Sequence, residues 1–413
     1  MRSSLGKIPI NKLSSLFFRM SAMASKFIIF TFLSKYFTSS EYGVYSLLST
    51  TITISIFILG FDFYNYSIRN ILLENKNVAS KVYSSFFLYI YVYVGFLFIG
   101  YLIFNQIDYL SQNTELLILI CITEHLNQEI YRMLLAFKKV LLANWFLFFR
   151  ITGWSVTVLI LILIFQKKLS LSDILLIWAS ANCVTLLMIA IVFSKTILAN
   201  LKKIKFQKQW ILKGLKVSVI FYLATIALKT IEYSNRYIVE AVLDESSAGI
   251  FSFYSNFSMI IGIYISTIVV SYELPDLIIS SETEQFKIKL KSFKKQLIIH
   301  SLIASLVILV CMYPILIWQE KEVFFSYWPL IILLTLGAFL MNISLIYHYY
   351  LYINFKEKKI LEIVVISGVI NIISTYIFCK ITGLYGAGFA FLLTGLLMLI
   401  LRKRAADKKG IMI

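Results

Sequence analysis

The chain has 413 residues, of which 60% are hydrophobic and 15% charged, and its mean hydropathy is +0.84. Soluble domains carry about 25% charged residues. This composition therefore excludes a soluble globule, a disordered chain and a small disulfide-stapled domain. The 39 Lys and Arg against 21 Asp and Glu give a net charge of +18. Such an excess suggests nucleic acid in a soluble protein, but in a membrane protein it records topology.

Twelve apolar stretches, each roughly 20 to 27 residues long, follow one another along the chain, and one helical span needs about 20 apolar residues. They are continuously apolar and too long for the strands of a membrane barrel, which alternate over about 10 residues. We therefore predict an all-α integral membrane protein of about 12 transmembrane helices, over residues 13–36, 42–66, 82–105, 115–137, 140–165, 174–195, 215–240, 248–272, 296–318, 329–353, 361–379 and 384–401.

The basic residues predict the orientation. With both termini in the cytoplasm, 28 of the 39 Lys and Arg residues fall on the cytoplasmic side, 5 fall in outer loops and 6 lie inside predicted spans. Cytoplasmic loops of membrane proteins are enriched in Lys and Arg. Most of the net charge therefore reports topology, and we expect no nucleic-acid partner.

The longest linker divides the chain into two halves. We predict an N-terminal six-helix lobe over residues 1–198, a basic cytoplasmic linker over 199–214 and a C-terminal six-helix lobe over 215–413. The linker is either a helix on the anionic inner leaflet or a solvated connection. Residues 37–50 and 243–256 are similar, with Gly43 aligned to Gly249 at an offset of 206 residues. Both segments start on the same side, which indicates a parallel repeat.

Four short motifs carry a family resemblance, which spans the chain in the number and order of its helices. They are SEYGVYS at 40–46, GFDFYNYSIR at 60–69, SNRYIV at 234–239 followed by AGIFS at 248–252, and YGAGFA at 385–390. Together they resemble the polysaccharide-unit (O-antigen or capsule, Wzx-type) flippases of the MOP superfamily, which includes the MATE transporters. Asn235 departs from the family pattern, where an Asp is frequent, so an ionic role at this position is in doubt.

The resemblance implies a two-lobed, V-shaped transporter with a central cavity, in a bacterial inner (cytoplasmic) membrane. Its expected cargo is an undecaprenyl-diphosphate-linked oligosaccharide repeat unit, moved from the inner to the outer leaflet for cell-surface polysaccharide biosynthesis. Membrane lipid, a polysaccharide polymerase and a chain-length regulator are the implied partners. No cofactor is implied, and the protein is expected to be a transporter and not an enzyme.

Charges inside the predicted spans are the main functional signal from the residues themselves. A charge at mid-membrane costs about 2.5–3.5 kcal/mol on insertion scales, so it normally faces a cavity or a partner. Six bases against four acids leave surplus positive charge, which favours an anionic guest such as a diphosphate. We therefore predict a cationic substrate cavity with Arg150 and Arg236 as its foremost members, within the set Arg19, Lys26, Arg132, Arg150, Lys229 and Arg236.

The acids in the spans have two possible roles, either lining the cavity with a part in ion coupling or pairing locally with the bases. The set is Asp62, Glu124, Glu129 and Glu232, with His125 beside it. Helical spacing allows Glu129 to pair with Arg132 and Glu232 to pair with Arg236. His125 either takes part in proton coupling or is a hydrogen-bonded structural histidine.

Two other functions remain open. A multidrug or organic-cation exporter of the same superfamily would have an acidic cavity, which the positive surplus disfavours. A membrane polysaccharide polymerase or glycosyltransferase would need a sizeable outer loop, whereas the predicted outer turns are short. The sequence has no Gly-rich phosphate loop, no HExxH motif and no clustered Cys and His. We therefore expect no catalytic, cofactor-binding or metal-binding residues.

Overall fold

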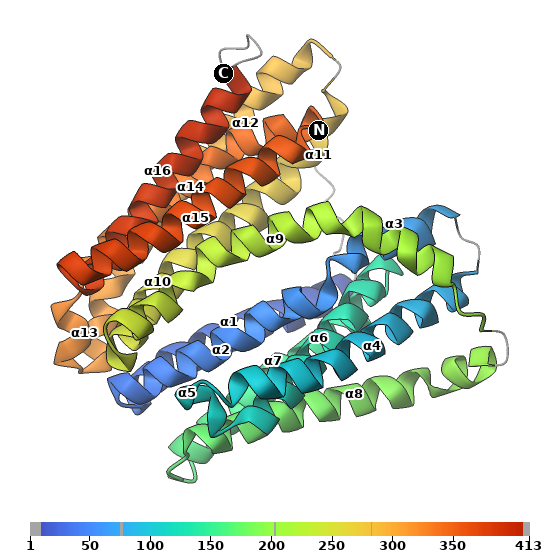
Figure 1. Ribbon diagram of the computed structural model, residues 1–413, viewed down its shortest axis with the longest axis horizontal. Helices are drawn as coiled ribbons and strands as arrows, with labels where there is room; N and C mark the ends of the chain where they lie inside the picture. Colours follow the sequence, from blue (N-terminus) through green and yellow to red (C-terminus); the bar gives the residue numbers. More distant parts are fainter. Residues whose placement is uncertain (1–9, 75–76, 202–203, 282, 408–413) are drawn as a thin grey trace. The chain divides into compact units, whose positions relative to one another are not determined.

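The computed structural model describes residues 10–74, 77–201, 204–281 and 283–407, and within this part of the chain every regular element is a helix (Figure 1). The helices are α1 (Ile10–Tyr36), α2 (Ser39–Gly60), α3 (Phe63–Glu74), α4 (Val78–Phe104), α5 (Asp108–Ser111), α6 (Thr114–Ala136), α7 (Val140–Leu163), α8 (Leu171–Leu201), α9 (Lys208–Val242), α10 (Glu245–Ile265), a π turn (Ser266–Val270), α11 (Ser271–Ile279), α12 (Gln285–Gln319), α13 (Glu322–Ser326), α14 (Leu330–Ile353), α15 (Glu357–Thr382) and α16 (Leu384–Asp407).

Eleven helical segments of the described chain are long and apolar enough to cross a membrane. They coincide with eleven of the twelve predicted spans. The exception is the predicted fourth span, which forms α6, a helix of 23 residues. Its length suffices for crossing, but Glu115, Glu124, Glu129 and Arg132 lower its hydropathy. The all-α membrane fold is therefore confirmed, and α6 is a long helix with an unusually polar face.

Several helices begin where a short polar motif caps them. Thr38 and Glu41 form a reciprocal capping box at the start of α2, and Ser170 and Asp173 form another at the start of α8. At the start of α10 the Asp244 carboxylate accepts a hydrogen bond from a backbone N–H. These caps satisfy amide groups that the first turn of a helix leaves without partners.

The chain divides into two compact units, and each is described by itself. Unit 1 contains residues 1–33 and 48–222, and unit 2 contains residues 34–47 and 223–413. The first part of α2 therefore belongs to unit 2, and the first part of α9 belongs to unit 1. Residues 202–203 of the predicted linker lie outside the described residues.

The central segment is shorter than the predicted linker and is bound to unit 1. α8 continues to Leu201 and α9 begins at Lys208. The backbone N–H groups of Lys205 and Gln207 donate to serine hydroxyls of α4, and the Trp210 indole donates to Asn70 of α3 at 2.6 Å. These hydrogen bonds tie residues 205–210 to α3 and α4, while Lys205 and Phe206 are exposed.

The two similar segments identified in the sequence contact each other inside unit 2. Ser39 of α2 is hydrogen-bonded to Ser246 of α10 at 2.8 Å, and Ser40 to Glu245 at 2.6 Å. A Cβ on Gly43 would lie 1.8 Å from the Glu245 carbonyl oxygen and 3.2 Å from the Gly249 nitrogen. At the offset of 206 residues, Glu245 corresponds to Ser39 and Ser246 corresponds to Ser40. The two hydrogen bonds therefore join the same two positions in reciprocal order, as in an isologous two-fold contact. The helices cross this closely because both positions lack a side chain.

Candidate functional site

The polar face of α6 contains a buried ion pair. Glu129 is 1% exposed and accepts hydrogen bonds from Arg132 Nη1 at 2.5 Å and from the Tyr89 hydroxyl of α4 at 2.8 Å. The Arg132 guanidinium also lies over the ring of Tyr64 on α3, 3.8 Å from its centroid. The local pairing of Glu129 with Arg132, one of the two readings of the sequence, is present.

His125 lies one turn earlier on α6 and is completely buried. Its Nδ1 is 2.6 Å from the Tyr93 hydroxyl, and its Nε2 is 3.9 Å from the Glu129 carboxylate. A Cβ on Gly60 would lie only 3.1 Å from Nε2, so the end of α2 approaches the ring closely. These contacts fix the imidazole between α2, α4 and α6, which favours the structural role for His125. Proton coupling through this residue remains a prediction.

Asp62 lies in the turn that ends α2 and separates it from α3. Phe61 and Asp62 have φ angles of 47° and 50°, in the left-handed region that non-glycine residues rarely adopt. The predicted second span is therefore shorter than 42–66, because these two residues end the helix. Asp62 is 6% exposed and interacts electrostatically with Glu129. The structure thus brings Asp62, His125, Glu129 and Arg132 into one polar cluster of unit 1.

Arg150 of α7 forms a second buried polar group with α6. Its Nε is 3.6 Å from a Glu124 oxygen and its Nη2 donates to the Gln128 side chain at 3.1 Å. The other Glu124 oxygen accepts a hydrogen bond from the Trp178 indole of α8 at 2.7 Å, and Trp178 stacks on Trp154. The guanidinium is thus held by two side chains of α6, the Glu124 carboxylate and the neutral Gln128 amide.

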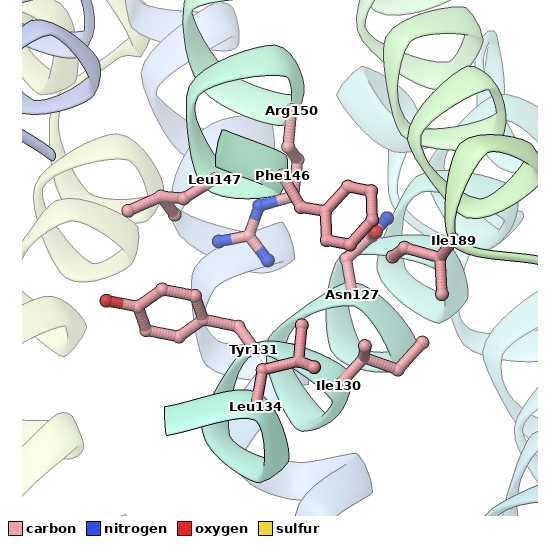
Figure 2. A pocket seen from close by; sticks show the side chains of 8 residues that line it. All are labelled: Asn127, Ile130, Tyr131, Leu134, Phe146, Leu147, Arg150 and Ile189. Carbon is pink, nitrogen blue, oxygen red and sulfur yellow. The ribbon is translucent and has the colours of Figure 1, made fainter. Parts of the chain in front are cut away.

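A small cavity lies beside Arg150. Figure 2 shows the guanidinium pointing from α7 toward Tyr131 and Asn127 of α6, with Ile189 of α8 closing the far side. The cavity volume is about 10 Å³, which is enough for about one water molecule. In the described conformation the cavity is therefore far too small for a sugar.

Arg236 forms the corresponding polar site of unit 2. It is 4% exposed, and its Nη2 donates to Asn256 at 2.6 Å and to Ser255 at 3.2 Å, both on α10. The ring of Tyr233 lies 5.5 Å from the guanidinium carbon. These two partners are neutral side chains that orient the guanidinium, and the Glu232 carboxylate interacts with it electrostatically.

Lys229 and Glu232 form a local pair on α9, with Nζ 2.6 Å from a carboxylate oxygen. The sequence suggested Arg236 as the partner of Glu232. The i,i+3 neighbour Lys229 takes this position because the Arg236 side chain extends to α10.

Asn235 lies at the centre of a buried network between α9, α15 and α16. Its Oδ1 accepts hydrogen bonds from Asn371 at 2.7 Å and from Thr375 at 3.0 Å, and Asn371 in turn accepts one from Thr394 at 2.9 Å. All four side chains are at most 1% exposed. The amide at position 235 is therefore a neutral structural acceptor between three helices.

Arg19 and Lys26 are exposed side chains of α1. Their separation of seven residues places them on one side of the helix, as expected. Their role in a cavity remains a prediction.

Two further basic residues are buried although they belong to the set of basic residues assigned to the cytoplasmic side. Lys81 at the start of α4 is 5% exposed and binds Glu74 at 2.5 Å. Arg402 of α16 is 4% exposed and donates to Ser344 of α14 at 2.7 Å. Arg402 stands beside Lys403 and Arg404 in the sequence, which hides it in a basic tail. The continuation of the helix to Asp407 was the missing signal.

An apolar cleft of about 410 Å³ lies in unit 2 between α12, α13 and α14. Its lining is Leu309, Met312, Tyr313, Leu316, Phe325, Trp328, Ile331 and Ile332. It offers no charged group to a polar ligand. Across the described residues, no group of three or more His, Cys, Asp and Glu is placed to hold a metal ion.

Comparison with solved structures identifies the fold. The inward-facing conformation of a multidrug resistance MATE family transporter of the MOP superfamily aligns with a TM-score of 0.70 at 13% identity, over 95% of this chain and all of that chain. The chain has the MATE/MOP transporter fold. The lipid II flippase MurJ, in an inward closed conformation, aligns with a TM-score of 0.72 at 14% identity, over 96% of this chain and 87% of that chain. A Vibrio cholerae MATE transporter mutant aligns with a TM-score of 0.57 at 12% identity, over 97% of this chain and 96% of that one.

In sequence, no family model matches the chain and no curated protein matches it. The similarity therefore lies in the fold, which MATE family transporters and a lipid II flippase share.

Proposed function

We propose that this protein is a flippase for undecaprenyl-diphosphate-linked oligosaccharide units in a bacterial inner membrane, serving O-antigen or capsule biosynthesis. The observation that carries the proposal is the excess of bases over acids within the spans, six against four. Surplus positive charge inside a membrane protein suits an anionic cargo. The fold supports the proposal because a lipid II flippase shares it.

Arg150 and Arg236 are the proposed diphosphate-binding residues, one in each unit. Both side chains are buried and donate to neutral amides, Gln128 and Asn256, that a phosphate oxygen could replace. Both arginines also interact with a carboxylate, Arg150 with Glu124 and Arg236 with Glu232. In this proposal the lobes 1–198 and 215–413 rock to give alternating access.

A double variant that neutralises both Arg150 and Glu124 distinguishes binding of the cargo by Arg150 from a purely structural ion pair. If Arg150 only balances Glu124, then Arg150→Gln is harmful and the double variant Arg150→Gln/Glu124→Gln restores transport, because no charge is left buried. If Arg150 binds the diphosphate, the double variant folds but transports poorly. We expect the second result for surface polysaccharide in cells and for flipping of lipid-linked sugar in proteoliposomes.

Arg236→Gln should likewise abolish surface polysaccharide at an unchanged protein level. Arg69→Gln is the matched control, since Arg69 is an exposed arginine of α3 outside the candidate spans. Normal polysaccharide in Arg236→Gln and in the neutralised pair would contradict the proposal.

Export of multidrug or cationic compounds is the second candidate, because a multidrug resistance transporter shares the fold. The buried carboxylates Glu124 and Glu129 would then bind the cation. Accumulation assays with cationic dyes test this: energy-dependent dye export by the purified protein would favour it over the flippase.

A further inference from the structure

Arg402 is a buried arginine in unit 2 with one hydrogen-bond partner among the described residues. That partner is the Ser344 hydroxyl of α14, which itself donates to the Met341 carbonyl. A guanidinium has five N–H donors. Within the described chain, no carboxylate oxygen lies within 4 Å of its nitrogens. Most of its donor capacity and its whole charge are therefore left for another ligand.

The guanidinium of Arg402 is almost completely buried, since the residue is 4% exposed, and only a small area of the nitrogens that make no hydrogen bond touches solvent. His348 lies one turn after Ser344 on α14, and its Nδ1 is buried without a hydrogen-bond partner. Two polar groups with unused capacity thus lie near the contact of α14 with α16.

The surroundings are basic. Lys403 and Arg404 follow Arg402 and are exposed, and the exposed Lys356 and Lys358 lie at the start of α15, which runs antiparallel to α16 through the turn at residue 383. Against them stand Glu357, Glu362 and Asp407, and Glu362 is paired with Lys359 at 2.8 Å. The local field therefore favours an anion.

This site is distinct from Arg236. α16 begins next to α13, where the Tyr385 hydroxyl donates to the Ser326 carbonyl. Arg402 lies 17 residues further along the helix, or about 25 Å at 1.5 Å per residue. Arg236 instead contacts Ser255 and Asn256 of α10, one residue from Tyr254, whose hydroxyl bonds to the Phe324 carbonyl of α13. The two arginines therefore lie toward opposite ends of unit 2.

We propose that Arg402, together with Ser344 and His348, forms a phosphate-binding site between α14 and α16. Arginine binds phosphate through two parallel N–H donors, and basic pockets between membrane helices bind phosphorylated lipid head groups. The phosphate can come from a membrane lipid or from a soluble anion. The site does not depend on the proposed flippase function, because an exporter could use it equally.

The test measures binding by the purified full-length protein. Inorganic diphosphate in a neutral detergent probes the soluble anion. Nanodiscs with phosphatidylglycerol, compared with phosphatidylcholine alone, probe the lipid source. A ligand that binds only the folded protein raises its unfolding temperature in a saturable manner. We expect this rise with at least one probe, and a response to diphosphate alone or to phosphatidylglycerol alone identifies the source.

Three variants decide the assignment. Arg402→Gln should weaken binding roughly tenfold or more, because the substitution removes the charge and the forked donors. A tenfold change corresponds to about 1.4 kcal/mol. Arg402→Lys keeps the charge but loses the fork, so it should weaken binding less; it decides the matter if Arg402→Gln does not accumulate. Arg404→Gln, an exposed arginine two residues away, should bind as the wild type does. The proposal is overturned by the absence of saturable binding, by unchanged binding in the Arg402 variants, or by equal weakening in the Arg404 variant.

Discussion

Each buried carboxylate on the polar face of α6 has specific ion-pair and hydrogen-bond partners. Glu129 is held by Arg132 and Tyr89, and Glu124 by Arg150 and Trp178. A buried ion pair with additional hydrogen bonds is tolerated, whereas one isolated buried charge is strongly destabilising. Loss of any one of these partners should therefore destabilise the protein, because it would leave a buried charge unpaired.

Glu129→Gln should destabilise the protein by about 3 kcal/mol, because the substitution leaves the Arg132 charge without its carboxylate. Thermal or denaturant unfolding in detergent measures this loss. Glu362→Gln, at an exposed pair on α15, is the control and should change stability by less than about 1 kcal/mol. Equal losses of stability for the two substitutions would show that the buried pair contributes no more than the exposed pair.

Glu74 gives a pH dependence that can be measured. Hydrogen bonds from Lys81 and Asn70 hold the pKa of its carboxyl below the usual 4.5. The folded state thus binds the proton less readily than the unfolded state, so the contribution is full above pH 4.5 and is lost as the pH falls below it. The difference in unfolding temperature between the wild type and Glu74→Gln should stay constant from pH 7 to about pH 5 and shrink as the pH falls from about 5 to about 3. A difference that stays constant from about pH 5 to about pH 3 would contradict the assignment.

At the level of the elements, apolar length predicted the helices well, and contacts between helices explain what it missed. The twelve stretches correspond to long helices because hydrophobic length is written directly in the sequence. The partner of Glu232 could not be predicted, since Lys229 and Arg236 are both at helical spacing and only the position of Asn256 on α10 decides between them. Burial of Arg402 was equally hidden, because it depends on Ser344 of α14.

The close crossing of α2 and α10 predicts that a Gly→Ala substitution there lowers the stability of the protein. In an ordinary helix Gly→Ala is stabilising by about 1 kcal/mol. Gly249→Ala should instead destabilise the protein, because the new Cβ would lie 2.5 Å from the Ser39 carbonyl oxygen. Gly95→Ala on α4 is the control, since no atom lies within 4 Å of its Cβ position. Unfolding temperatures in detergent compare the two, and a rise for both would contradict the close crossing.

At the scale of the whole molecule, the predicted topology depends on α6 crossing the membrane. Its charges exclude it from the eleven apolar candidates, yet the basic residues alternate correctly only if twelve helices cross. If α6 did not cross, every later loop would change sides and the positive-inside pattern would reverse.

Single cysteines on a background without native cysteines test this. Ser111→Cys should react with an impermeant maleimide from outside intact cells, and Lys139→Cys should react only after permeabilisation. Labelling of both positions from the same side would exclude α6 as a span.

The reciprocal contact of α2 with α10 has a consequence for the history of the chain. Ser39 with Ser246 and Ser40 with Glu245 form the pattern in which a surface meets a copy of itself. An ancestral protein half as long, assembled as a homodimer, would have had the same pair of contacts with identical residues on both sides. In such a dimer one substitution would alter both contacts at once. In this chain Glu245 occupies the position that corresponds to Ser39, so the two contacts consist of different residues.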